Sequence, residues 1–198
     1  MATQSFVRKR PSKNGGVRVL DRISSTGWAS LIGATAFTLT VLNCAWVCDD
    51  AFITFRSIDN FLGGFGLRWN VAERVQTFTH PLWLLLLVPV VLVFGDPYFA
   101  VLVQSITISA AAAWFSMRFF SADWQQAVVI AILLCVSKAF VDFSTSGLEN
   151  PLIHALFACF IYGYMLCHGR NRTAYLCWIA GLSALTRLDS LVLLSPAL

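Results

Sequence analysis

The sequence predicts an all-α fold, a polytopic transmembrane helical bundle, and three observations favour it. Hydrophobic residues make up 58% of the 198-residue chain. Charged residues make up only 12%, well below the ~25% that is usual in soluble domains. Several apolar runs alternate with short polar turns, and helices satisfy their own backbone hydrogen bonds inside lipid.

The chain begins with a basic segment, residues 1–26, ahead of a first apolar run at 27–47. The basic residues of this segment are Arg8, Lys9, Arg10, Lys13, Arg18 and Arg22. Positive charge beside a span marks its cytoplasmic side, so we expect a cytoplasmic N-terminus and no nucleic-acid partner. A cleaved signal peptide is the alternative, but the basic region is long and no small-residue cleavage site precedes Asp49.

Further apolar runs follow at 81–94, 98–117, 127–143, 152–167 and 175–198. If all of them crossed the membrane, the basic turn with Arg170 and Arg172 would lie outside, against the positive-inside rule. The run at 81–94 is short and contains Pro89, which suits a re-entrant or partly inserted helix. We therefore expect 81–94 not to cross. The basic turn and Arg118 then both lie on the inside.

This layout puts two loops on the outer face. The first is 48–80, which opens with two adjacent carboxylates, Asp49 and Asp50. The second is 144–151, which contains Glu149. We expect the first to be the catalytic loop, with the second beside it.

An amphipathic juxtamembrane helix is expected in the first outer loop, because apolar residues recur there at helical spacing. The apolar face comprises Phe52, Phe55, Ile58, Phe61 and Leu62, and the polar face comprises Arg56, Asp59 and Asn60. Asp49 or Asp50 would cap this helix, and Gly63-Gly64 would end it. On a purely structural interpretation, the aspartates are a cap and a marker of the bilayer edge.

The same loop contains the residue types of a phosphate site. Arg56, Arg68 and Arg74 cluster where positive charge is normally sparse, and guanidinium groups bind phosphate well. Glu73 and His80 add further polar groups. Carboxylates that can deprotonate a hydroxyl, beside arginines that can hold a phosphate, suit group transfer from a lipid phosphate.

A family resemblance is visible in three segments. They read DDAFITFRSIDNFLGGFGLRWNVAERVQTFTHPLWLLLL, SGLENPL and LTRLDSLVLL, and together they resemble the GT-C integral-membrane glycosyltransferases, most closely the arabinofuranosyltransferase branch. The resemblance implies transfer of a sugar, such as the pentofuranose arabinose, from a polyprenyl-phosphate donor to a glycan or protein acceptor. It places the reaction at the periplasmic face of a bacterial inner (plasma) membrane.

The resemblance also implies roles for the outer-loop residues. Asp49 and Asp50 become the catalytic candidates, one of them as the base toward the acceptor hydroxyl. The other candidates are Arg56, Arg74 and His80 for the donor phosphate, with Arg68 from the same cluster, and Glu73 and Glu149 for the sugar or the acceptor. Some members use a divalent cation, so a metal at the two aspartates stays open, and no other cofactor is expected.

Family members are longer than this chain. We therefore expect residues 27–198 to be the N-terminal part of a larger transmembrane domain, truncated at the C-terminus. Such a piece could be inactive, so a non-catalytic membrane scaffold and a transporter subunit remain alternatives, although a transporter would place more polar groups near the bilayer midplane. Arg187 and Asp189 interrupt the last apolar run and have an open role, whereas Lys138 and Asp142 suit an intrahelical ion pair.

Overall fold

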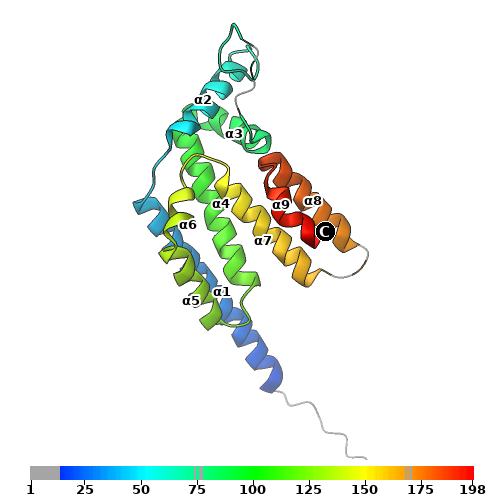
Figure 1. Cartoon of the computed structure of the whole chain (residues 1–198). Coiled ribbons are helices and arrows are strands. Elements are labelled where there is room, and N and C mark those ends of the chain that lie inside the picture. The colour runs from blue at the N-terminus through cyan, green and yellow to red at the C-terminus, as the bar shows by residue number, and fades with distance from the viewer. Residues whose placement is uncertain (1–13, 74, 76–77, 168, 170) are drawn as a thin grey trace, which may run out of the picture.

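The computed structural model describes residues 14–73, 75, 78–167, 169 and 171–198. Helices make up 77% of these residues and none of them lies in a strand, which confirms the all-α prediction for this part of the chain. In chain order the elements are α1 (Asn14–Asn43), α2 (Asp49–Leu62), α3 (Pro81–Phe94), α4 (Pro97–Phe119), α5 (Trp124–Val136), α6 (Lys138–Phe143), α7 (Asn150–Leu166), α8 (Asn171–Thr186), α9 (Ser190–Leu194) and the 3-10 helix η1 (Ser195–Ala197) (Figure 1).

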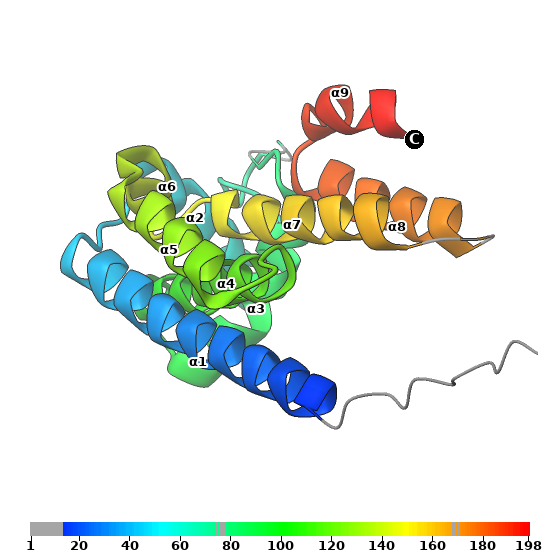
Figure 2. The same ribbon diagram turned by 90° about the horizontal axis from the view of Figure 1, so that it is seen from below.

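Helices α1, α4, α5, α7 and α8 run along the molecule in alternating directions (Figure 1). At one end, Ser25 of α1 and Trp124 at the start of α5 line the same pocket, and we call this the Trp124 end. At the other end, the Cys48 amide donates to the Ser146 carbonyl at 2.9 Å, and we call this the Glu149 end. Viewed from below, α4 lies between α1 and α7, with α8 and α9 beyond α7 (Figure 2).

Helix α3 lies at the Glu149 end beside α2 and does not run the length of the molecule (Figure 1). Its 14 residues rise by about 21 Å, less than the ~30 Å of a bilayer core. Pro81 opens the helix, and Gly95, in the left-handed conformation at φ 73°, ends it. Trp83, Leu84 and other apolar side chains of its inner face pack with buried residues of α2 and α4 and join the three helices.

In the described part of the chain, two helices are long and apolar enough to cross a membrane. They are Ser25–Asn43 within α1, with a mean hydropathy of 1.2, and α4, with a mean hydropathy of 1.6. Helices α3, α5 and α7 are apolar but shorter. The length of α5 follows from a backbone break inside a run that looked continuous in the sequence.

Two of the apolar runs are not single helices. The run 127–143 is divided at Ser137, whose backbone leaves the helical region at ψ 96°, so α5 ends before it and α6 begins after it. The last apolar run is divided between α8 and α9 at the turn of residues 187–189. The predicted Lys138–Asp142 pair is confirmed as an ion pair within α6.

The amphipathic helix predicted within residues 48–80 is α2, and it ends at Gly63 as expected. Its buried side differs from the prediction at Asn60, and Phe52, Phe61 and Leu62 of the predicted apolar face are exposed. Asn60 was expected on the polar face, but it is buried and its amide donates to the carbonyls of Arg68 and Trp69, each at 2.8 Å. The polar side chain therefore anchors the segment after α2, while Phe52 is 52% exposed.

Candidate active site

A polar cavity of about 230 Å³ lies at the Glu149 end. Its lining residues are Asp50, Ile53, Thr54, Thr79, His80, Leu148, Glu149 and Arg187. They come from α2, from the residues before α3, from the loop before α7 and from the turn between α8 and α9. Segments that are far apart in the sequence thus place two carboxylates, an imidazole and a guanidinium around one space.

The loop before α7 is held firmly enough to position Glu149. The side chains of Ser144, Thr145 and Ser146 are fully buried. The Trp83 indole donates to the Gly147 carbonyl at 3.2 Å, so α3 is tied to the same loop. With the Cys48 bond described above, the loop is joined to the starts of both α2 and α3.

Gly147 allows this loop to approach α2 closely. Its φ is 85°, a left-handed value that side chains disfavour. A Cβ at this position would lie 2.7 Å from the Ala51 Cβ and 3.0 Å from Val47 Cγ1. Only glycine therefore lets the loop and the start of α2 come together at the cavity.

We expect Gly147→Ala to destabilise the protein more than Gly64→Ala does. Both glycines have similar positive φ values, 85° and 82°, but a Cβ on Gly64 would meet no atom within 4 Å. Gly64→Ala should therefore cost only the left-handed backbone term of about 1–2 kcal/mol, whereas Gly147→Ala adds overpacking worth about 1–3 kcal/mol. Thermal unfolding of the two variants measures the difference, and equal midpoints would contradict the close approach.

A network of charged and polar groups centres on Glu149, which is buried with 3% exposure. Its Oε1 accepts from Arg187 Nη1 at 3.1 Å, and its Oε2 lies 3.2 Å from His80 Nδ1. On the far side of the imidazole, His80 Nε2 lies 2.9 Å from Thr54 Oγ1. Arg187 also donates to both oxygens of Asp189, at 3.1 and 2.8 Å.

The surroundings of these groups lower two pKa values, each for a different reason. Burial lowers the pKa of His80 from 6.5, and the nearby Arg187 lowers it further, while Glu149 opposes both. The hydrogen bonds from Arg187 lower the pKa of the exposed Asp189 carboxyl. The imidazole is thus favoured in its neutral form, while Asp189 stays ionised beside the guanidinium.

The two predicted catalytic aspartates occupy different positions. Asp50 is exposed and lines the cavity, so its carboxylate is open to a ligand. Asp49 turns back, and its Oδ1 accepts from the Asp50 amide at 3.1 Å. Neither is the helix cap that was expected: the N-cap is Cys48, and both aspartates lie in the first turn of α2, where a carboxylate favours the helix dipole.

Of the other predicted site residues, His80 and Glu149 line the cavity. Arg56, Arg68 and Glu73, the others that the structure describes, do not. Arg56 is exposed on α2. Arg68 donates through Nη1 to the Val71 carbonyl at 3.1 Å, and Glu73 accepts from Asn70 at 3.4 Å. Arg74 falls outside the described residues.

Among the lining residues that were not selected from the sequence, Arg187 and Thr54 belong to the polar network. Arg187 had a signal, because a charged residue that interrupts an apolar run is normally buried against protein or water. Thr54 follows Asp50 by four positions, so helical spacing alone could have placed it on the same side of α2. In the described part of the chain, no three His, Cys, Asp or Glu side chains converge as metal ligands would, and we assign no step to a cation.

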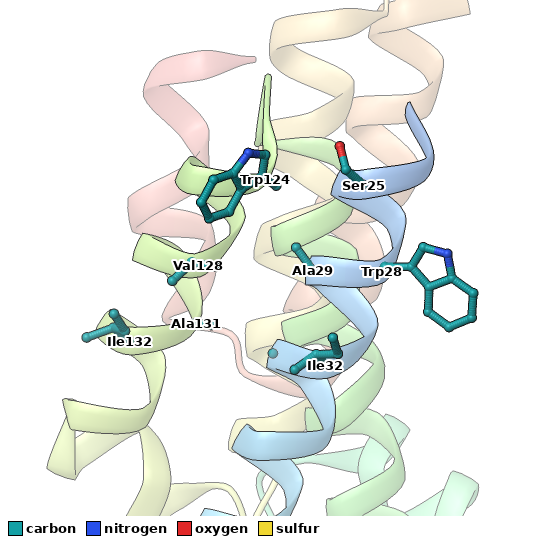
Figure 3. A pocket seen from close by; sticks show the side chains of 9 residues that line it. Ser25, Trp28, Ala29, Ile32, Trp124, Val128, Ala131 and Ile132 are labelled. Atoms are coloured by element: carbon teal, nitrogen blue, oxygen red, sulfur yellow. The ribbon is translucent and has the colours of Figure 1, made fainter. Parts of the chain in front are cut away.

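A larger cavity, of about 530 Å³, lies at the Trp124 end between α1 and α5. Trp124 and Val128 of α5 face Ala29 and Ile32 of α1, while the Trp28 indole points away (Figure 3). None of its described lining residues is charged. It offers no acid or base, so the chemistry is assigned to the smaller cavity.

Comparison with known proteins gives one informative similarity. No protein-family model and no solved structure matches the chain. A terminal beta-(1->2)-arabinofuranosyltransferase of Corynebacterium glutamicum is 31% identical over an alignment of 121 residues, and the match covers 52% of this chain. The match covers 16% of that relative's length. It indicates a distant glycosyltransferase relationship for the part of the chain that it covers.

Proposed function

We propose that this chain forms the donor side of a membrane glycosyltransferase, which transfers a sugar from a polyprenyl-phosphate donor to a glycan or protein acceptor. The arabinofuranosyltransferase similarity favours a pentofuranose such as arabinose as the sugar. The observation that supports this best is the cavity at the Glu149 end, which joins an open carboxylate, Asp50, to a guanidinium, Arg187. A site at the ends of apolar helices suits a donor whose tail stays in lipid.

The arrangement of the helices supports a multi-pass topology. Helices α1, α4, α5, α7 and α8 alternate in direction, and α3 stays at the Glu149 end (Figure 1). Arg118 at the end of α4 and Arg172 at the start of α8 then lie toward the Trp124 end. By the positive-inside rule this end is cytoplasmic, together with the basic residues 1–26, and the cavity faces the outside of the inner membrane.

Asp50 is assigned as the general base. The acceptor hydroxyl oxygen forms a bond to the anomeric carbon of the sugar, and its proton passes to the Asp50 carboxylate. The bond from the anomeric carbon to the donor phosphate breaks, and polyprenyl phosphate leaves as an anion. A carboxylate helps here because the proton is lost during attack, when the hydroxyl becomes acidic.

Arg187 is assigned to the donor phosphate. A guanidinium has five N–H groups, of which Asp189 takes two and Glu149 takes one. Two remain for a ligand, and the side chain is 47% exposed. Asp189 and Glu149 together carry more negative charge than Arg187 carries positive charge. Arg56, Arg68 and Arg74 are therefore proposed to supply further positive charge to the donor phosphate as it enters, with Glu73 as a contact to the sugar.

Binding of a polyprenyl-phosphate arabinofuranose by the chain in lipid nanodiscs tests the assignment. We expect Arg187→Gln to weaken binding about 10–100-fold, the usual range for hydrogen bonds to a charged group. Arg118→Gln, at the opposite end, is the matched control and should bind as the unsubstituted protein does. Equal affinities in the two variants would contradict the role of Arg187. Equal binding of the polyprenol that lacks phosphate would contradict the donor class and favour a scaffold.

A further inference from the structure

His80 lies between two partners that define which ring nitrogen carries its proton. Arg187 Nη1 donates to Glu149 Oε1, and a carboxylate offers acceptors only. Since Glu149 Oε2 lies 3.2 Å from His80 Nδ1, Nδ1 must be the donor. The Thr54 hydroxyl can then donate to Nε2 at 2.9 Å. Both ring nitrogens are satisfied in a single tautomer without any added proton.

We propose that His80 is a positioning residue, held as the neutral Nδ1–H tautomer, which fixes the Glu149 carboxylate and through it the Arg187 guanidinium beside the cavity. The positioning role rests on the function proposed above for Arg187. It replaces the expectation that His80 binds the donor phosphate, because both of its nitrogens are already engaged inside the protein.

The contacts explain why such a residue is needed. Arg187 lies in the turn between α8 and α9, whereas Asp50 lies on α2. Glu149 reaches Arg187 with one oxygen and His80 with the other, and His80 reaches α2 through Thr54. Without the bond from His80, the carboxylate could rotate about its side-chain torsions, and the guanidinium would lose its fixed position.

The charged groups around the imidazole agree with a neutral ring. Glu149 faces it from the start of α7, Arg187 faces it from the α8–α9 turn, and Asp50 of α2 lines the same cavity. Burial and Arg187 lower the pKa of His80 more than Glu149 raises it. A free imidazole is half protonated at pH 6.5, whereas His80 should remain mostly neutral there and titrate only at lower pH.

Nitrogen-15 NMR of the histidine rings tests the tautomer directly, in the full chain without any ligand. Protonated and unprotonated ring nitrogens give well-separated signals, and the His80 pair is the one that disappears in His80→Asn. We expect an Nδ1–H pattern that is unchanged between pH 7.5 and 6.5. An Nε2–H pattern, or an imidazolium at neutral pH, would overturn the proposal.

Substitution of each partner separates their roles. Thr54→Val removes only the donor to Nε2, so we expect the Nε2 signal to shift while the Nδ1–H tautomer persists. Glu149→Gln replaces an obligate acceptor with an amide that can also donate, so the tautomer should become mixed. A mixed tautomer in Thr54→Val but not in Glu149→Gln would mean that Thr54, and not Glu149, determines the tautomer of His80.

Donor affinity then tests the positioning itself. The amide nitrogen of asparagine occupies the place of Nδ1, so His80→Asn can still donate to Glu149, whereas the longer His80→Gln places its amide near Nε2. We expect His80→Gln to weaken binding of polyprenyl-phosphate arabinofuranose by about tenfold or more, and His80→Asn to restore most of that loss. Equal losses would overturn the positioning role. The NMR result does not depend on donor binding, so failure of the proposed function leaves the tautomer as a separate finding.

Discussion

Asp50→Asn is expected to reduce sugar transfer by about 10²–10⁴-fold, the usual contribution of a general base. Asparagine has nearly the same shape as aspartate, so the cavity should keep its form while losing the group that accepts the proton. Asp49→Asn should have a much smaller effect, because Asp49 bonds the backbone amide of Asp50 and does not line the cavity. The structure thus predicts unequal roles for two adjacent carboxylates that the sequence could not distinguish.

The measurement is transfer from polyprenyl-phosphate arabinofuranose in membranes that contain the protein, with donor binding determined on the same samples. If Asp50 is a base that acts on the acceptor, its replacement should lower turnover and leave donor binding almost intact. Transfer that survives in Asp50→Asn would exclude it as the base. An equal loss of transfer in Asp49→Asn would show that both carboxylates in the first turn of α2 are needed.

Local signals in the sequence predicted most of the helices. The end of α2 at Gly63 follows from a glycine pair, and the short α3 follows from Pro81 at its start and Gly95 at its end. The break at Ser137 had no such signal, since serine does not interrupt a helix by itself. That break depends on how the chain packs, so composition and periodicity could not locate it.

The same contrast between local signals and packing applies to the candidate site. Asp50, His80 and Glu149 could be selected because carboxylates and a histidine stand out beside apolar runs. Their connections could not, because the contact from Glu149 to Arg187 joins residues 38 positions apart and the contact from Thr54 to His80 joins residues 26 apart. Such pairs form only when the helices assemble, and they connect polar residues from separate segments in one network.

Glu149→Leu is expected to destabilise the protein by about 1–3 kcal/mol, the cost of leaving buried donors without an acceptor. The substitution removes the partner of His80 Nδ1 and of Arg187 Nη1 together. His80 is buried and bears most of this cost. Arg187 is about half exposed and keeps Asp189, so water can replace part of its loss, and the effect should stay below the 3–5 kcal/mol of a fully buried broken pair.

The matched control is Glu73→Gln, which changes an exposed glutamate between α2 and α3 and should alter stability by less than about 0.5 kcal/mol. Reversible denaturation in mixed micelles gives the free energies of unfolding. A double-mutant cycle with His80→Leu then isolates the bond between the two buried groups: once Glu149 is gone, removing the imidazole should cost less than it does in the unsubstituted protein, because the orphaned donor disappears with it. Additive losses would mean that His80 and Glu149 stabilise the fold independently, and that the network does not transmit position from α2 to Arg187.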